Sequence, residues 1–181
     1  MKDKNILLGV TGSISAYKAA DLASKLFQAG ANVKVVMTPY ATEFIPPLSF
    51  RAVTKNEVFT DDFASTVNKG ITHVNLGDKA DVVVIAPATA NTIAKIAYGL
   101  ADNILTATVL ATTAPVVIAP AMHTNMYLNP ATQENIAKLK ARGYIMVGPD
   151  SGPLASGGSG PGRLTEISKI IEAIEEVLEK K

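Results

Sequence analysis

Short runs of continuously apolar residues recur along this chain, separated by longer segments with a different spacing. Each run predicts a strand buried on both faces, because a strand with one face in water would alternate apolar and polar side chains. We expect such strands at residues 6–10, 33–37, 82–85, 115–119 and 144–147.

The segments between these runs place apolar side chains every three or four residues, which is the spacing of one face of a helix. In the first segment Ala16, Ala19 and Leu26 share a face, and Gly30 provides a helix stop. The segment 164–180 is strongly amphipathic. Helices are therefore expected over residues 15–29, 89–98, 101–111, 130–142 and 164–180, with another beginning near residue 48.

Alternation of strands and helices predicts an α/β domain built on a parallel sheet. Residues 5–37 form a strand–helix–strand unit, whose crossover should be right-handed. The chain has 181 residues, which is enough for one domain with a sizeable core. We therefore expect a single domain over residues 1–181.

Two segments lack a clear period. Residues 56–70 are expected to run over the surface. Residues 150–163 hold five glycines and two prolines, which leaves a linker or a mobile flap over a site as alternatives. We favour the flap, because a terminal linker would not be followed by a strongly amphipathic helix.

Composition narrows the functional classes. Apolar residues make up 48% of the chain and aromatic residues 6%, so Val, Ile, Leu and Ala must form the core. A net charge of +1 gives no bulk field for nucleic acid or for an anionic membrane. The absence of cysteine excludes disulfides and thiolate chemistry, and with only two histidines it argues against structural zinc. No apolar run is long enough for a signal peptide or a membrane span, so we expect a cytoplasmic protein.

Candidate chemistry lies just past two of the predicted strands. Residues 118–127 read Ile-Ala-Pro-Ala-Met-His-Thr-Asn-Met-Tyr, and residues 85–92 repeat the layout with Ile-Ala-Pro-Ala-Thr-Ala-Asn-Thr. Open α/β sheets bind ligands at this edge, and two such ends suggest a phosphate-bearing, planar ligand. His123 is either a ligand-binding side chain or a capped loop histidine. Asn91 suits a carboxylate or a flavin edge, although Thr89 or Asn91 could instead cap the helix.

The turn after the first strand, Gly-Val-Thr-Gly-Ser-Ile-Ser at residues 9–15, suits phosphate. Gly12 allows a ligand to approach closely, Ser13 and Ser15 carry hydroxyls, and the helix start offers N–H groups. The turn lacks the third glycine of a dinucleotide fingerprint and the Lys of a P-loop, so a mononucleotide fits better than NAD or ATP. A turn of small residues needed only for packing is the alternative.

Five groups of residues together resemble the phosphopantothenoylcysteine decarboxylases, within the flavin-containing cysteine decarboxylases. The resemblance covers nearly the whole chain, and no single motif carries it. The groups are Thr-Gly-Ser-Ile-Ser-Ala-Tyr-Lys at 11–18, His73 with Leu76 and Ala-Asp at 80–81, residues 87–92 followed by Gly-Leu-Ala-Asp-Asn at 99–103, Pro-Ala-Met at 120–122, and Gly-Pro-Gly-Arg at 160–163.

The resemblance implies a Rossmann-like, flavodoxin-like three-layer sandwich that binds FMN. It implies a homo-oligomer, a trimer or a dodecamer, with the flavin at a subunit interface. It also implies decarboxylation of 4′-phosphopantothenoylcysteine to 4′-phosphopantetheine in coenzyme A biosynthesis. In the family the flavin oxidises the cysteine side chain of the substrate, the resulting thioaldehyde allows CO₂ to leave, and the flavin then reduces the enethiolate.

The resemblance also implies roles for individual residues. His73 matches the active-site histidine, although a lone histidine is more often structural. The Gly-rich segment 150–163 matches a substrate clamp, in which Ala155, Ser156 and Arg163 join Met122 and His123 at the substrate. The positions that match FMN-binding residues are Gly12, Ser13, Ile14, Thr38, Thr89, Ala90, Asn91, Thr92 and Ala121.

Two of these positions depart from the family pattern. His123 stands where the family commonly has an asparagine that holds the substrate carboxylate, and a histidine can also donate to a carboxylate. Ser156 stands where the family has a cysteine that donates a proton, and a hydroxyl is far less acidic than a thiol. Ser156 or a water it orients could suffice, the serine could be an engineered replacement, or the reaction could stop at the oxidised enethiol.

The last of these outcomes is that of a peptidyl-cysteine decarboxylase acting on a precursor peptide, which is the main alternative function. A flavin prenyltransferase is disfavoured, because no Arg-rich segment follows residues 102–104. A phosphatase-binding regulatory flavoprotein is disfavoured because such proteins carry acidic tails. A fused ligase domain, if present in this lineage, is expected to be a separate protein or to lie beyond Lys181.

Overall fold

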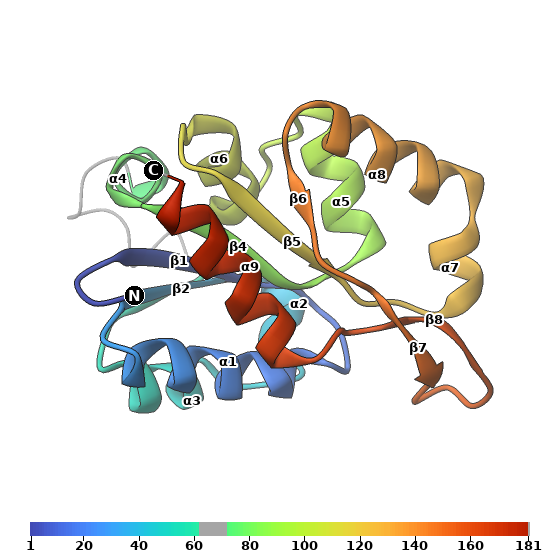
Figure 1. Cartoon of the computed structure of the whole chain (residues 1–181), viewed down its shortest axis with the longest axis horizontal. Coiled ribbons are helices and arrows are strands. Elements are labelled where there is room, and N and C mark those ends of the chain that lie inside the picture. The colour runs from blue at the N-terminus through green and yellow to red at the C-terminus, as the bar shows by residue number, and fades with distance from the viewer. Residues whose placement is uncertain (62–71, 181) are drawn as a thin grey trace.

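A parallel sheet forms the centre of the computed structural model, which describes residues 1–61 and 72–180 (Figure 1). Each strand pairs in parallel with its neighbours. The runs predicted as buried strands all lie in this sheet, and most of their residues are inaccessible to solvent. Across the sheet the order is β3 (Val58–Phe59), β2 (Asn32–Met37), β1 (Asn5–Val10), β4 (Val82–Ala88), β5 (Val116–Pro120) and β6 (Ile145–Met146).

Helices cover both faces of the sheet and create two separate cores. One core joins the sheet to α1 (Ala16–Gln28), α3 (Pro47–Thr54) and α9 (Ile167–Glu179). The other joins it to α4 (Thr72–Lys79), α5 (Ala90–Tyr98), α6 (Ile104–Ala111) and α8 (Pro130–Ala141). Two shorter helices, α2 (Pro39–Thr42) and α7 (Thr124–Leu128), follow strand ends. The predicted flavodoxin-like three-layer sandwich is confirmed.

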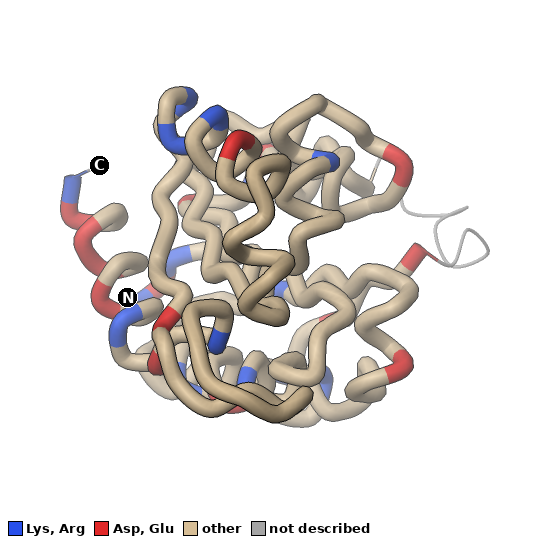
Figure 2. The backbone as a smooth tube through the Cα atoms, turned by 90° about the vertical axis from the view of Figure 1, so that its right-hand side faces the viewer, with Lys and Arg blue, Asp and Glu red and all other residues tan. Residues whose placement is uncertain are grey.

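Charged residues of both signs are spread along the backbone, as the small net charge suggested (Figure 2). Of the helices in residues 1–61 and 72–180, none is long and apolar enough to cross a membrane.

Several predicted boundaries were wrong for identifiable reasons. Helix α6 begins at Ile104 rather than at residue 101, because the Asn103 side chain accepts the Thr106 N–H (2.9 Å) and caps the helix there. Helix α9 begins at Ile167, because β8 occupies the chain as far as Arg163. The expected surface run over residues 56–70 contains the edge strand β3, and its residues 62–70 lie outside the described part of the chain.

The Gly-rich segment forms a hairpin of β7 (Asp150–Pro153) and β8 (Ser159–Arg163), so the linker alternative was wrong, while a mobile flap over a site stays a prediction. Its base is docked, since the Met122 N–H donates to the Gly162 carbonyl (2.9 Å). A Cβ built at Gly162 would lie 2.2 Å from the Met122 carbonyl oxygen. At the tip, Gly157 and Gly158 face open space. The base is therefore fixed by close backbone packing, while mobility of the tip stays a prediction.

Two alanine substitutions distinguish the cost of a steric clash from the cost of backbone strain. Gly162 (φ +137°) and Gly157 (φ +88°) both have positive φ, so alanine strains the backbone at either position. Gly162→Ala should lower the free energy of unfolding by about 2–4 kcal/mol, since it adds a clash with Met122 to the backbone strain. Gly157→Ala, with nothing within 4 Å, should cost only about 1 kcal/mol. Urea denaturation of both variants measures the difference, and equal losses would contradict the docking of the hairpin base.

Candidate active site at the carboxyl edge of the sheet

The strand order changes direction between β1 and β4. From β1 the chain passes to β2 on one side, and after β3 it returns to β4 on the other side of β1. The loops that leave the carboxyl ends of β1 and β4 therefore diverge and leave a crevice between them. Ligands of open α/β sheets bind at such switch points.

Thr11 joins the two loops at this point. Its side chain is buried, and its Oγ1 donates to the Pro87 carbonyl (2.7 Å) while it accepts the Thr89 N–H (3.0 Å). The Ala121 N–H donates to the Ala88 carbonyl (3.0 Å), which adds the loop after β5 to the same group. The two Ala-Pro-Ala strand ends are thus neighbours, tied to each other and to the turn after β1.

A cavity of about 570 Å³ opens beside these loops. Its walls come from the turn after β1, the start of α1, the loop after β5 and the tip of the hairpin. Ten of the predicted site residues line it together, although they come from distant parts of the sequence. These are Gly12, Ser13, Ile14, Thr89, Ala121, Met122, His123, Ala155, Ser156 and Arg163.

The remaining predicted residues lie elsewhere. Thr38 follows β2, where its N–H donates to the Val10 carbonyl (3.0 Å). Ala90, Asn91 and Thr92 form the first turn of α5 but do not line the cavity. The cap of this helix is Thr89, whose Oγ1 accepts the Thr92 N–H (3.3 Å).

His73 is separated from the cavity within the chain. It lies near the start of α4, a helix that the sequence did not predict, and it is not among the cavity-lining residues. Helix α4 packs against α6 on the sheet face opposite to α1. If His73 acts at this cavity, it must therefore do so from another copy of the chain.

The turn after β1 differs in detail from the expectation. The Tyr40 ring packs against the Gly12 backbone. A Cβ added at Gly12 would lie 2.5 Å from that ring, so a glycine is needed here to make room for Tyr40. The Ser13 Oγ accepts the Ser15 N–H (3.2 Å), and the Ala16 N–H donates to the Ser13 carbonyl (2.9 Å). The amides of Ser15 and Ala16 are therefore already used within the turn.

His123 combines the two roles that the sequence left as alternatives. It caps α7, because its Nδ1 accepts the Asn125 N–H (3.1 Å). In the neutral ring this arrangement places the proton on Nε2. The side chain also lines the cavity, so Nε2–H is the donor available to a ligand.

Six further residues line the cavity although no role was predicted for them. Tyr17 and Lys18 lie at the start of α1, and Phe44, Met126, Pro153 and Leu154 supply apolar wall. Ser15, whose hydroxyl was a phosphate candidate, lines the cavity as well. Tyr17 and Lys18 belong to the motif at residues 11–18, and this motif was the sequence feature that could have pointed to them as site residues. Among the residues that the structure describes, the cavity lining contains cations and apolar groups but neither Asp nor Glu. This donor set and volume fit a planar ligand that bears phosphate.

The motif at residues 99–103 has a structural role away from the cavity. Gly99 (φ +70°) ends α5, and Asn103 begins α6. Asp102 accepts a hydrogen bond from Lys95 (2.6 Å), which lowers the pKa of its carboxyl group. Asp61 accepts the Ile104 N–H (2.6 Å), and burial raises the pKa of Asp61.

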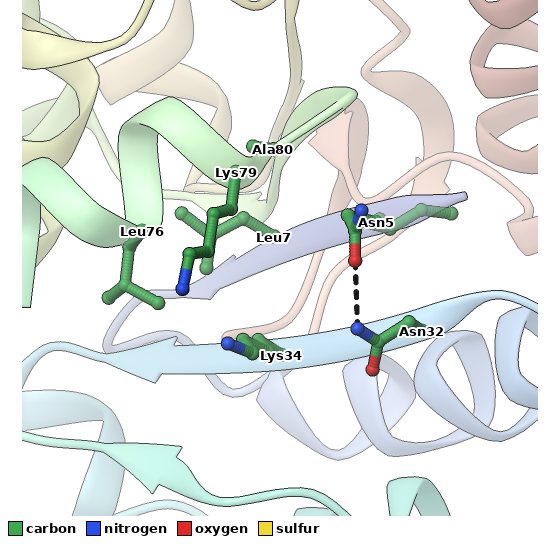
Figure 3. Close-up of a pocket in the computed structure, with 8 residues that line it drawn as sticks. Asn5, Leu7, Asn32, Lys34, Leu76, Lys79 and Ala80 are labelled. Carbon is green, nitrogen blue, oxygen red and sulfur yellow. Dashed lines mark hydrogen bonds between the residues drawn. The ribbon is translucent and has the colours of Figure 1, made fainter. Parts of the chain in front are cut away.

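A second cavity, of about 390 Å³, lies at the opposite edge of the sheet (Figure 3). Lys34 and Lys79 face it, and Asn32 donates to Asn5 (2.8 Å) across the amino ends of β1 and β2. This cavity shares no lining residue with the first and contains no predicted site residue.

Comparison with known proteins agrees with this geometry. A family model described as Flavoprotein matches residues 1–179. A probable phosphopantothenoylcysteine decarboxylase of Streptococcus mutans is 48% identical over 177 residues, which cover 97% of this chain and 99% of the relative. The coenzyme A biosynthesis bifunctional protein CoaBC of Bacillus subtilis is 49% identical over 97% of this chain, but this chain spans only 43% of that relative.

Solved structures are similar over nearly the full length. A mutant phosphopantothenoylcysteine (PPC) decarboxylase complexed with pantothenoylaminoethenethiol has a TM-score of 0.87 at 36% identity, over 98% of this chain and 100% of that one. The FMN-dependent cysteine decarboxylase SpaF has a TM-score of 0.85 at 38% identity, over 98% and 96%.

The sheet, the switch-point cavity and these matches define an α/β flavoprotein. The chain belongs to the flavoprotein family that includes the phosphopantothenoylcysteine decarboxylases.

Replacing the Thr11 hydroxyl should loosen the site. Thr11→Val leaves the Pro87 carbonyl and the Thr89 N–H unpaired, which should lower the free energy of unfolding by about 1–3 kcal/mol and reduce the flavin retained on purification. Thr54→Val is a matched control, because Thr54 is equally buried but its hydroxyl donates to Phe50 within α3. Normal flavin retention by Thr11→Val would contradict the role of this tie.

Proposed function

We propose that this chain catalyses the FMN-dependent decarboxylation of 4′-phosphopantothenoylcysteine to 4′-phosphopantetheine, a step of coenzyme A biosynthesis in the cytoplasm. The observation that carries the proposal is the single cavity that combines the small turns after β1, β4 and β5 with the hairpin tip and its cationic neighbours. Similarity to the Streptococcus mutans decarboxylase over almost all of both chains supports it.

FMN would be held along the carboxyl edge of the sheet. Gly12, Ser13 and Ile14 form one wall, and Ala121, buried just after β5, forms another part of the lining. Thr38 and the first turn of α5, residues 89–92, extend the same edge, and the positive end of the α5 dipole favours a phosphate. When bound, FMN supplies the oxidation of the cysteine side chain of the substrate and its later reduction.

The substrate would be held by the loop after β5 and the hairpin. His123 donates Nε2–H to the substrate carboxylate, and Met122, Ala155 and Arg163 complete the wall. The hairpin tip covers the cysteine end of the substrate and excludes water. The docked base of the hairpin holds the tip in position over the cavity. Ser156, which lines the cavity at that tip, is the proton donor.

The reaction is tested by anaerobic turnover of 4′-phosphopantothenoylcysteine with mass analysis of the product. Release of CO₂ together with 4′-phosphopantetheine is expected. A protein that retains FMN but releases no CO₂ from this substrate would overturn the proposal. A product two hydrogens lighter than phosphopantetheine would place the failure in the proton-donating step at Ser156.

Ser156→Cys should accelerate that step, because a thiol with a pKa near 8.5 donates a proton far more readily than a hydroxyl. The fraction of fully reduced product in a single anaerobic turnover should rise, while CO₂ release stays unchanged. Ser159→Cys is a suitable control, since Ser159 is exposed on β8 and does not line the cavity. An unchanged product ratio in Ser156→Cys would remove Ser156 from the proton path.

The second candidate is a peptidyl-cysteine decarboxylase that forms a C-terminal enethiol on a precursor peptide. Ser156 favours it, because a weak proton donor suits an enzyme that stops at the oxidised product. The same anaerobic assay with a peptide ending in cysteine separates the two functions. Loss of CO₂ and two hydrogens from the peptide, with none from 4′-phosphopantothenoylcysteine, would select this alternative.

We further propose a homo-oligomer, a trimer or a dodecamer, in which His73 of one copy completes the cavity of another. Within one chain His73 lies on α4, which covers one face of the sheet, and it is not among the residues that line the cavity at the carboxyl edge. Large apolar side chains that line the cavity are also exposed, among them Ile14 (58%), Tyr17 (62%) and Met126 (49%). Exposed apolar groups of this density suit an interface between copies.

Mixing two inactive variants tests this arrangement. His73→Asn and Arg163→Ala should each lose CO₂ release while FMN stays bound. Oligomers formed from both should recover about a quarter of the wild-type rate, because random mixing leaves that share of interfacial sites intact. Mixed oligomers as inactive as their parents, with full flavin content, would place His73 and Arg163 in the same chain's site.

A further inference from the structure

Lys18 is a cation of the cavity without a counter-charge among the described residues. The basic side chains Lys18, His123 and Arg163 line the cavity, and within residues 1–61 and 72–180 neither Asp nor Glu does. The Arg163 guanidinium donates to the Glu166 carboxylate (3.0 Å). Lys18 makes no ion pair with any residue in the ranges 1–61 and 72–180, so its charge is left for a ligand.

Helix α1 directs Lys18 toward the cavity. The buried face of this helix carries Ala16, Ala19 and Leu22, which pack against the sheet. Ser15 and Lys18 are three residues apart and therefore lie on a common flank, and both line the cavity. Lys18 is partly buried, and a desolvated ammonium group gains most from a partner of opposite charge.

We infer that Lys18 binds the terminal phosphate monoester of the substrate and thereby selects the phosphorylated compound, an inference that rests on the proposed function. The substrate carries anions at both ends, its carboxylate beside the reacting cysteine and its phosphate at the far end. His123 serves the first, and Lys18 serves the second. Phe44, Met126 and Leu154 give the uncharged arm between them an apolar wall.

If Lys18 binds the phosphate, its substitution should weaken only the binding of phosphorylated ligands. Substitution of other cavity residues should not discriminate between phosphorylated and dephosphorylated ligands in this way. An ammonium–phosphate hydrogen bond in a partly desolvated site is worth about tenfold to a hundredfold in affinity. Lys18→Met keeps the length of the side chain and removes its charge. It should therefore weaken phosphorylated ligands by that factor and leave their dephosphorylated counterparts unchanged.

The experiment measures two properties of the FMN-loaded enzyme. Calorimetry gives the affinities for 4′-phosphopantetheine and pantetheine, and CO₂ release gives kcat and KM for 4′-phosphopantothenoylcysteine and pantothenoylcysteine. Lys18→Arg should keep the preference for the phosphorylated ligands. Lys25→Met is the matched control, because Lys25 lies on the same helix, outside the cavity, and pairs with Asp21 (2.6 Å).

In Lys18→Met the expected result is a ratio of the two affinities near one, a raised KM for the phosphorylated substrate, and unchanged kcat and flavin content. An unchanged ratio, an equal loss for both ligands, or loss of FMN would overturn the inference. Failure of the proposed function would give a different result. The wild-type enzyme would then release no CO₂ from 4′-phosphopantothenoylcysteine, regardless of how Lys18→Met changes the ratio of the two affinities.

Discussion

The site depends on a single buried hydroxyl. Thr11 lies where β1 ends, and its Oγ1 donates to the Pro87 carbonyl near the end of β4 and accepts the N–H of Thr89, which follows that strand. A buried hydroxyl that uses its donor and an acceptor position fixes two backbones at one distance. Ala121 then joins the loop after β5 to β4, and Gly162 joins the hairpin to that loop. This series of hydrogen bonds thus joins the turn after β1, the ends of β4 and β5 and the base of the hairpin.

Electrostatics follow from the same arrangement. The chain as a whole has a net charge of only +1, yet the described cavity lining has no acidic side chain and includes Lys18 and Arg163. The starts of α1 and α5 lie at the same edge and add the positive ends of their dipoles. The positive potential is therefore local, and it suits a cofactor and a substrate that are both anionic.

The strands could be predicted because burial on both faces leaves an unbroken apolar signature, as in β1, β4 and β5. Helix α4 could not, since its sequence Thr-His-Val-Asn-Leu-Gly-Asp-Lys has too few apolar positions to show a period. The hairpin was missed for a different reason. Its strands consist mostly of Gly, Ser and Pro, and the contact between Gly162 and Met122 that holds them is tertiary.

The candidate site was predicted in part for the same physical reasons. Residues after strand ends meet because the topology brings them together, so Gly12, Thr89 and Ala121 could be placed at one edge from sequence. Lys18 could not, because a lysine on a helix ordinarily belongs to its solvated face. His73 could not be placed either, since its position follows from α4 and from the opposite face of the sheet.

We propose that the cavity beside Thr11 is the binding site for FMN. Fluorescence titration of the flavin-free protein with FMN and with riboflavin tests it most directly, because the two ligands differ only in the phosphate. We expect one FMN to bind per chain and riboflavin to bind more weakly by about tenfold or more. Equal affinities for the two flavins, or no saturable binding of FMN, would contradict it.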